Sequence, residues 1–132
     1  MTGAAVASPR MGTDARHARG RRGEEIAAAH LERLGYEIVA RNHRTRFGEL
    51  DLVAYDGRVL AFVEVKTRLA DSGEPWESLH PVKQAQVRRM ARAWLAEAEG
   101  RPTVAELRFD AIGVLLDPAG GLVALNHVQA AF

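Results

Sequence analysis

The sequence contains no cysteine, which excludes disulfide bonds and thiolate metal sites. No apolar run approaches the ~18 residues that a membrane-spanning helix needs. The N-terminal stretch MTGAAVASPRMGTDARHARGRRG lacks the apolar segment of a secretory signal, and no such segment follows Arg21 and Arg22 as it would in a twin-arginine signal. From these absences we expect a cytoplasmic protein with no membrane partner.

An excess of charge of one sign is also missing. The formal net charge is +1, so the chain as a whole is not a basic surface for nucleic acid. The arginines are unevenly spread, however. Five lie between residues 10 and 22 against the single acid Asp14, and the string RNHRTR spans residues 41–46. Two such clusters can contact phosphate backbones, although a solvated tail and a polar loop account for the same charges equally well.

Lysine is scarce, with only Lys66 and Lys83 against 16 arginines. A lysine retained in such a chain is informative, because its ammonium is a compact charge whose pKa shifts readily. A Gly-rich phosphate loop, a G-x-S-x-G motif and a zinc signature are all absent, and the five histidines show no metal-ligand spacing. The stretch around Lys66 is therefore the one to explain.

The length of 132 residues indicates one domain with one hydrophobic core. Residues 1–18 are small, polar and basic without periodicity, and we expect them to form a flexible basic N-terminal arm. Residues 19–132 are expected to form the single domain.

The apolar pattern predicts helices at 23–35 and from Pro81 to just before Gly100. In the first helix, Ala27, Leu31 and Leu34 fall on one face. A polar connection is expected over 41–47. Strands are expected at 36–40, 50–55, 59–66, 107–116 and 122–128. The order α-β-β-β-α-β, with a final short strand, predicts an α/β fold with a central mixed sheet flanked by helices.

The predicted hairpin GELDLVAYDGRVLAFVEVKTR, residues 48–68, carries charged residues on strands that are otherwise apolar. Side chains alternate along a strand, so Glu64 and Lys66 point to the same face. Asp51 begins the first strand of a hairpin that turns at Asp56-Gly57. We therefore expect Asp51 and Glu64 to be cross-strand neighbours at one end of the sheet.

Two neighbouring buried carboxylates repel each other and are costly to desolvate. One lysine cannot offset both, whereas Mg²⁺ takes oxygen ligands and needs only one or two carboxylates. The backbone carbonyl of Val65 is a further candidate ligand, and Lys66 could activate a water molecule or stabilise charge on a phosphate. The alternative is a buried salt bridge, with Lys66 neutralising one acid and the other acid at a solvated edge.

The pattern Asp51 followed by Glu64-Val65-Lys66, after a helix that carries an acid, resembles the PD-(D/E)xK nuclease superfamily, in which the fold is restriction-endonuclease-like. Leu50 stands where the nominal motif has proline. The strings GRRGEEIAA (20–28), LGYEIVARNHR (34–44), GELDLVA (48–54), FVEVKTR (62–68) and RFDAI (108–112) resemble the YraN-like family of uncharacterised bacterial proteins. That family is similar to archaeal Holliday-junction resolvases, which are dimeric Mg²⁺-dependent endonucleases.

The resemblance implies a metal-dependent endonuclease that hydrolyses phosphodiester bonds in DNA, including branched DNA, with Mg²⁺ or Mn²⁺ as cofactor. Asp51 and Glu64 would be metal ligands, Lys66 the catalytic lysine, and Glu24 the helix acid that completes the site, with Glu25 as the alternative. The resolvase analogy also implies a homodimer. Two other hypotheses stay open: a non-catalytic nucleic-acid-binding module that retains the fold, and an interaction protein in which the acids form only an ion network.

Several other residues have weaker expectations. Glu49 lies two residues before Asp51 and is either another acid of the site or a solvated rim carboxylate. Asp110 is expected to be structural or to support the site, and His30 to be a packing residue. The candidate contacts to DNA backbone are Arg21, Arg22, Arg44, Arg46 and Lys83, which would give no sequence readout.

Overall fold

The computed structural model describes residues 3–71, 79–98 and 106–132. Within them the chain forms two helices and one five-stranded sheet. The elements are α1 (Gly3–Arg33), β1 (Glu37–Thr45), β2 (Gly48–Tyr55), β3 (Val59–Leu69), α2 (Pro81–Glu97), β4 (Glu106–Leu116) and β5 (Leu122–Val128). The predicted α-β-β-β-α-β order with a final strand is confirmed.

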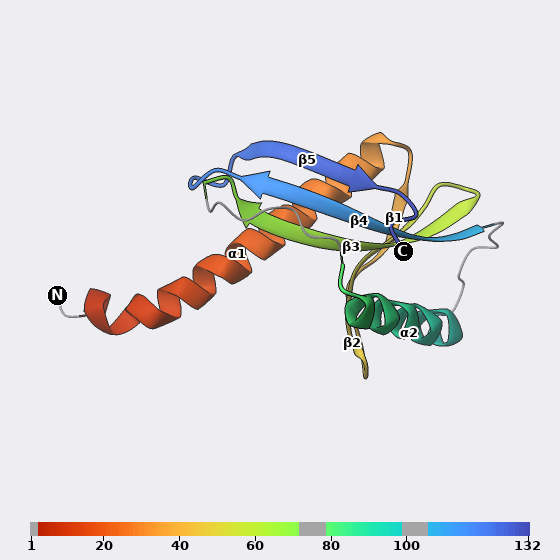
Figure 1. Ribbon diagram of the computed structural model, residues 1–132, viewed down its shortest axis with the longest axis horizontal. Helices are drawn as coiled ribbons and strands as arrows, with labels where there is room; N and C mark the ends of the chain where they lie inside the picture. The colour runs from red at the N-terminus through yellow and green to blue at the C-terminus, as the bar shows by residue number, and fades with distance from the viewer. Residues whose placement is uncertain (1–2, 72–78, 99–105) are drawn as a thin grey trace.

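The sheet has the strand order β1-β2-β3-β4-β5. β3 and β4 are parallel, while the other neighbouring pairs are antiparallel, so the sheet is mixed as expected. The connection between β3 and β4 contains α2, as a parallel pair requires. α1 packs mainly on β3 and β4, and α2 contacts β1, β2 and β3 (Figure 1). The two helices thus flank the central sheet.

Each helix buries its own set of apolar residues. On α1, Ile26, Ala27 and Leu31 pack against residues of β2, β3 and β4. On α2, Val87 and Trp94 pack with a second group that includes residues of β2 and β3. Side chains of β3 alternate between the two groups, because successive residues of a strand face opposite sides of the sheet. This explains why VLAFV reads as a continuous apolar run.

The starts of α2 and β3 follow from local hydrogen bonds. The backbone N–H of Val82 donates to Nδ1 of His80, which caps α2, and proline at the first helical position needs no hydrogen-bond partner. The carboxylate of Asp56 accepts from the backbone N–H groups of Arg58 and Val59, and Gly57 has φ +102°. These contacts fix the Asp56-Gly57 turn of the predicted hairpin.

Three boundaries differ from the sequence-based expectation. α1 begins at Gly3 rather than at residue 23, so it includes most of the segment expected as a flexible basic arm, and the first half of the helix projects beyond the sheet (Figure 1). Leu34, assigned to the apolar face of this helix, is 53% exposed and follows the helix end. β1 continues through Thr45, where a polar connection was expected. Neither element has an apolar stripe in its sequence there, because neither a projecting helix nor an edge strand needs one.

Candidate metal centre

The candidate site lies where β2 and β3 separate. Their pairing runs from Tyr55–Leu60 to Leu52–Val63 and ends there. The next residue of β2, Asp51, instead accepts a hydrogen bond from the backbone N–H of Val65 at 2.8 Å through Oδ2. One of its carboxylate oxygens therefore replaces a ladder hydrogen bond, which fixes the side chain between the two strands.

Glu24 reaches this point from α1. The helix approaches β3 closely at Gly23, where a Cβ atom would lie 1.9 Å from Oγ1 of Thr67. Only glycine permits this approach. The carboxylate oxygens of Glu24, Glu49 and Asp51 lie within 4.8 Å of one another. The structure thus brings Glu24 to the site, whereas its neighbour Glu25 is exposed.

Asn42 is a residue of the site that sequence reasoning missed. It lies on β1 with φ +47°, in the left-handed region that asparagine tolerates better than most residues. With its amide nitrogen turned toward the acids, it donates to Oε1 of Glu49 and to Oε2 of Glu24, both at 3.0 Å. The arginine-rich surroundings of Asn42 gave no signal of this role.

The carboxylate cluster consists of Glu24, Glu49, Asp51 and Glu64, and three of its members have a raised pKa. Burial, followed by the charge of Asp51, raises the pKa of Glu24 from its ordinary 4.5 to about 7. The same two causes raise the pKa of Glu64 from 4.5 to about 7, against the opposing effect of Lys83. Burial also raises the pKa of Asp51, although the hydrogen bond from Val65 opposes the change. The cluster therefore lacks enough positive charge of its own.

The two lysines occupy different places. Nζ of Lys83, in the first turn of α2, lies 3.3 Å from Oε1 of Glu64. Lys66 is half-buried two residues after Glu64 on β3 and, within the described part of the chain, forms no ion pair with the cluster. Lys83, which was expected to contact the DNA backbone, is therefore the lysine that contacts a carboxylate. Neighbouring Gln84 donates to the carbonyl of Leu79, so it supports the helix start.

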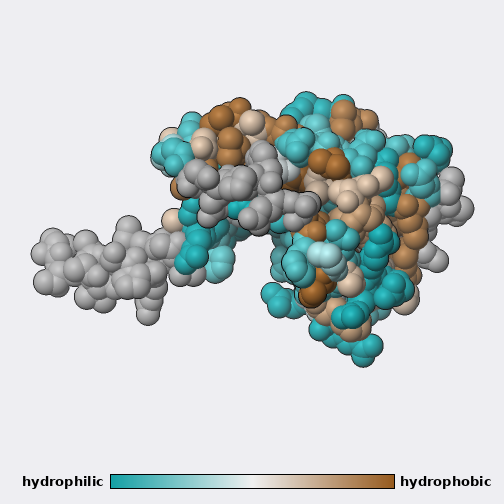
Figure 2. Space-filling view, in the orientation of Figure 1, coloured by the Kyte–Doolittle hydropathy of each residue, from teal (hydrophilic) through white to brown (hydrophobic). Residues whose placement is uncertain are grey.

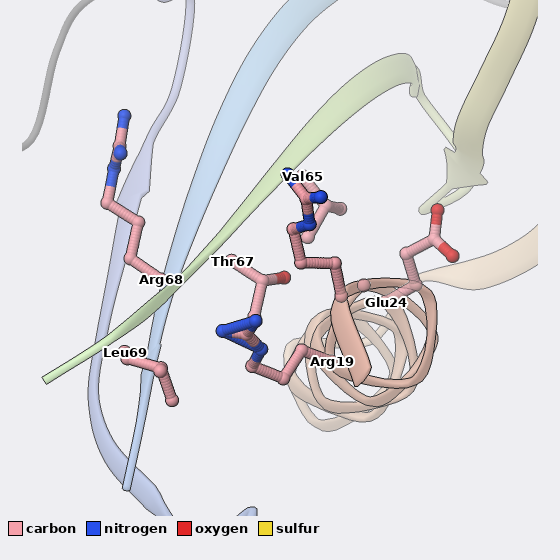
Figure 3. A pocket seen from close by; sticks show the side chains of 8 residues that line it. Arg19, Glu24, Val65, Thr67, Arg68 and Leu69 are labelled. Carbon is pink, nitrogen blue, oxygen red and sulfur yellow. The ribbon is translucent and has the colours of Figure 1, made fainter. Parts of the chain in front are cut away.

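Two clefts flank the cluster on either side of α1. One, of about 430 Å³, lies between Arg19, Gly20 and Glu24 of α1 and Val65 and Thr67 of β3. Figure 3 shows Arg19 reaching from the helix toward Thr67, while Glu24 leaves the helix on its other side. Both clefts combine cationic side chains with the acids, which suits a negatively charged ligand beside a cation.

The second cleft, of about 440 Å³, is lined by Arg16, His17, Gly20, Arg21, Glu24, Asn42 and Glu49. Arg21, one of the residues expected to contact DNA, thus lies beside the carboxylates. Arg16 lines both clefts and was noted in the sequence only as part of the basic cluster. The spacing of Arg16 from Glu24 along one helix is the signal that would have identified Arg16 as part of the site.

The other expected DNA contacts are dispersed. Nε of Arg22 donates to the carbonyl of Gly120 at 3.2 Å, in the turn before β5. Arg44 is exposed and lies 3.6 Å from Oε2 of Glu49, and the guanidinium of Arg46 lies 4.8 Å from the ring centroid of Phe47. Arg44 is therefore close to the cluster through Glu49, while Arg22 lies toward β5.

The donor set fits a hard divalent cation. It consists of carboxylate oxygens held by backbone and side-chain hydrogen bonds, and oxygen is the ligand that Mg²⁺ and Mn²⁺ prefer. The residues that would hold the ion are Asp51 and Glu64, with Glu24 and Glu49 alongside. A cation there would offset the burial and the mutual repulsion that raise the pKa of Glu24 and Glu64.

A second buried acid, Asp110 on β4, is arranged differently. It is 0% exposed and accepts from Nε of Arg108 at 2.8 Å and from the backbone N–H of Ala130 at 3.1 Å. His127 on β5 lies 2.9 Å from its Oδ2 and contacts His30 on α1 at 3.0 Å. Asp110 therefore joins α1, β4 and β5 as a structural residue, and His30 packs within the same network.

The fold and the cluster define an α/β protein with a restriction-endonuclease-like α-β-β-β-α-β core. No described helix is long and apolar enough to cross a membrane. The model of the uncharacterised protein family UPF0102, also called the YraN family, matches residues 23–114. The chain belongs to this family, which confirms the resemblance of its sequence to the YraN-like family.

The relatives give the same assignment over nearly the full chain. A UPF0102 protein of Nocardia farcinica is 46% identical, covering 89% of this chain and 91% of the relative. One of Acidothermus cellulolyticus is also 46% identical, with coverages of 89% and 96%. UPF0102 protein GSU0650 of Geobacter sulfurreducens is 47% identical, with coverages of 86% and 87%. These names state no activity, so the function must be argued from the site.

Proposed function

We propose that this protein is a Mg²⁺- or Mn²⁺-dependent endonuclease that hydrolyses phosphodiester bonds in DNA, including branched DNA. The observation that carries the proposal is the carboxylate cluster at the point where β2 and β3 separate: one oxygen each of Glu24, Glu49 and Asp51 lie within 4.8 Å of one another, and the charge of Asp51 also acts on the buried Glu64. Glu24, Asp51 and Glu64 each have a raised pKa. Groups perturbed in this way by burial and by one another are characteristic of functional sites.

Each residue of the cluster has a separate role in this proposal. Asp51 and Glu64 hold the cation, with the carbonyl of Val65 beside them, and Glu24 completes the site from α1. When bound, the cation would polarise the phosphate and lower the pKa of a water molecule. Asp51 is held in place by the N–H of Val65, so little reorganisation is needed before binding.

Lys66 and Lys83 supply positive charge on the α2 side. Lys83 balances Glu64 through the 3.3 Å ion pair. Lys66, without such a pair among the described residues, is left to assist the attacking water or to stabilise the charge that develops on the phosphate. Lys66 is therefore the proposed catalytic lysine, and Lys83 tunes the ligand Glu64 or contacts the phosphate.

Arginines beside the cluster would hold the DNA backbone. Arg16 and Arg21 line the cleft that contains Glu24 and Glu49, and Arg44 lies next to Glu49. Contacts from such residues are sequence-independent and weaken with salt. This suits recognition by the shape of the DNA rather than by its sequence.

The test is calorimetric titration of Mg²⁺ and Mn²⁺ into the purified protein, with a junction-cleavage assay on the same samples. The variants are Asp51→Asn, Glu64→Gln and Lys66→Met. Glu106→Gln serves as the control, because it removes an exposed carboxylate that pairs with Arg58 at 3.6 Å on the surface. We expect both acid variants to lose metal binding and cleavage, and Lys66→Met to retain folding and metal binding but lose cleavage.

The alternatives predict other results. If the wild type binds DNA tightly in EDTA and cleaves with neither metal, the protein is a non-catalytic nucleic-acid-binding module. If it binds neither metal, even with DNA present, the endonuclease proposal is wrong. Metal binding that survives in Asp51→Asn and Glu64→Gln would place the ion elsewhere.

A further inference from the structure

Asn42 departs from the regular backbone conformation of β1. It has φ +47°, and among the described residues Ala130 is the other non-glycine residue with a positive φ. Non-glycine residues in the left-handed region concentrate at functional sites, where the surrounding structure holds them. In the register of β1 and β2, Asn42 lies opposite Asp51. The unusual backbone therefore occurs across from an acid of the carboxylate cluster.

The side chain of Asn42 joins two carboxylates that come from different elements. Its amide nitrogen donates to Oε2 of Glu24 on α1 and to Oε1 of Glu49 on β2, both at 3.0 Å. An amide nitrogen has two hydrogens, one for each acid, whereas the amide oxygen would offer these carboxylates no hydrogen. Asn42 thus connects α1, β1 and β2 at the cluster.

A neutral donor has a particular advantage at this position. Carboxylate oxygens of Glu24, Glu49 and Asp51 lie within 4.8 Å of one another, and their like charges favour separation. A lysine or arginine could also hold two of these acids together, but a cation would then have to displace its charge. The amide holds them without adding charge, and each carboxylate keeps lone pairs for a further partner.

The bridge lies where the cluster meets solvent. Asn42 is exposed, while Glu24 and Asp51 are half-buried. Asn42, Glu24 and Glu49 all line the cleft of about 440 Å³ beside α1, and α1 presents hydrophilic surface where it leaves the sheet (Figure 2). A ligand can therefore reach the acids past Asn42, although water competes for the same hydrogen bonds.

We propose that Asn42 is a positioning residue of the cation site. It holds Glu24 and Glu49 beside Asp51 before the ion binds, and this assigns Glu49 to the site rather than to a solvated rim. The inference rests on the proposed function, because it requires that the cluster binds a divalent cation. It adds the residue that arranges two of the acids.

The first test is calorimetric titration of Mn²⁺ into the metal-free wild type, Asn42→Gly and Ala130→Gly, with the melting temperature of each. Glycine accepts the left-handed conformation, so Asn42→Gly removes the amide and keeps the backbone. Ala130→Gly is the matched control, because Ala130 has φ +49° and its N–H to Asp110 is kept.

We expect Asn42→Gly to raise the dissociation constant for Mn²⁺ by roughly tenfold, the lower end of the usual effect of a residue that orients metal ligands. Its melting temperature should change no more than that of Ala130→Gly, and the control should bind Mn²⁺ like the wild type. A residue that served only the fold would instead lower the melting temperature and leave the affinity unchanged.

A second test uses the metal-free protein and needs no nuclease assay. The chain contains two asparagines, Asn42 and the exposed Asn126, so their side-chain NH₂ signals can be compared by NMR. We expect the signals of Asn42 to shift in both Glu24→Gln and Glu49→Gln, because each variant changes one acceptor of its amide. Those of Asn126 should stay in place.

The outcomes separate this inference from the proposed function. A wild type that binds no Mn²⁺ would contradict the proposed function. Wild-type binding that Asn42→Gly leaves unchanged, or that Ala130→Gly weakens equally, would overturn only the role of Asn42. Amide signals of Asn42 that respond to neither glutamine variant would overturn it as well.

Discussion

Asp110 and the acids of the candidate site, Glu24, Asp51 and Glu64, are in opposite electrostatic environments. Burial alone would raise the pKa of Asp110, but hydrogen bonds with His127, Arg108 and Ala130 lower it below its ordinary value. At the candidate site, burial raises the pKa of Glu24, Asp51 and Glu64, and the charge of Asp51 raises the pKa of the two glutamates further. Asp110 is thus balanced by groups of the protein itself, whereas the ion pair of Lys83 with Glu64 balances the three acids only in part.

We interpret this difference as one between an acid that serves the fold and acids that we propose to bind a cation. A buried acid that serves the fold needs its counter-charge and donors built in, as Arg108 and the backbone of Ala130 provide for Asp110. An acid that must bind a cation cannot be fully neutralised, because the cation would then have to displace the neutralising group. Lys83 offsets the negative charge of Glu64 only in part, which fits that requirement.

The largest predicted difference is in stability at pH 7 without divalent metal. Asp110→Asn leaves Arg108, whose side chain is 13% exposed, without its counter-charge and should lower the free energy of unfolding by about 3–5 kcal/mol. Asp51→Asn removes repulsion and can keep the hydrogen bond from Val65, so stability should be unchanged or raised. Urea unfolding followed by circular dichroism measures both.

Glu106→Gln is again the control. Because it removes only an exposed ion pair, it should change the free energy of unfolding by no more than about 0.5 kcal/mol. If Asp51→Asn destabilised the protein as strongly as Asp110→Asn does, the cluster would be a structural ion network. The protein would then fit the interaction hypothesis better than the nuclease one.

A smaller effect is expected in the pH dependence of stability in EDTA. Glu24 and Glu64 have folded pKa values of about 7 against ordinary values of 4.5, so between these values the folded state binds more protons than the unfolded state. Their stabilising contribution to the free energy of unfolding is therefore fully present below about pH 4.5 and is lost as the pH rises through about 7. Asp110 acts in the opposite sense, since its contribution is lost only as the pH falls below its ordinary 3.8.

Urea unfolding at a series of pH values from 4 to 8 measures this contribution. The double variant Glu24→Gln/Glu64→Gln should show a flatter dependence than the wild type over the range from pH 4.5 to 7. An equally steep dependence in both proteins would mean that these two carboxylates do not titrate in that range.

Most of the fold could be predicted from the sequence because it depends on burial. The apolar run of β3, the hairpin turn at Asp56-Gly57 and the start of α2 at Pro81 all leave local signals. The N-terminal part of α1 and the end of β1 could not be predicted, because residues such as Arg41 and Arg44 are equally common in loops and on exposed edges.

The site was predictable in part for the same reason. Strand pairing was enough to bring Asp51 and Glu64 to one end of the hairpin. It could not show that the backbone pairing stops at Leu52–Val63, so that the carboxylate of Asp51 accepts a hydrogen bond from the N–H of Val65. The contacts of Asn42 and Lys83 depend on how β1 and α2 lie against the hairpin, which short-range patterns do not encode.

The central claim is that the carboxylate cluster binds a divalent cation, and crystals grown with Mn²⁺ test it most directly. Diffraction data collected at the manganese absorption edge would locate the ion by its anomalous signal. The account predicts a peak in contact with the carboxylates of Asp51 and Glu64 and no peak at Asp110. Crystals saturated with Mn²⁺ that show no peak at the cluster, with Lys83 still paired to Glu64, would contradict it.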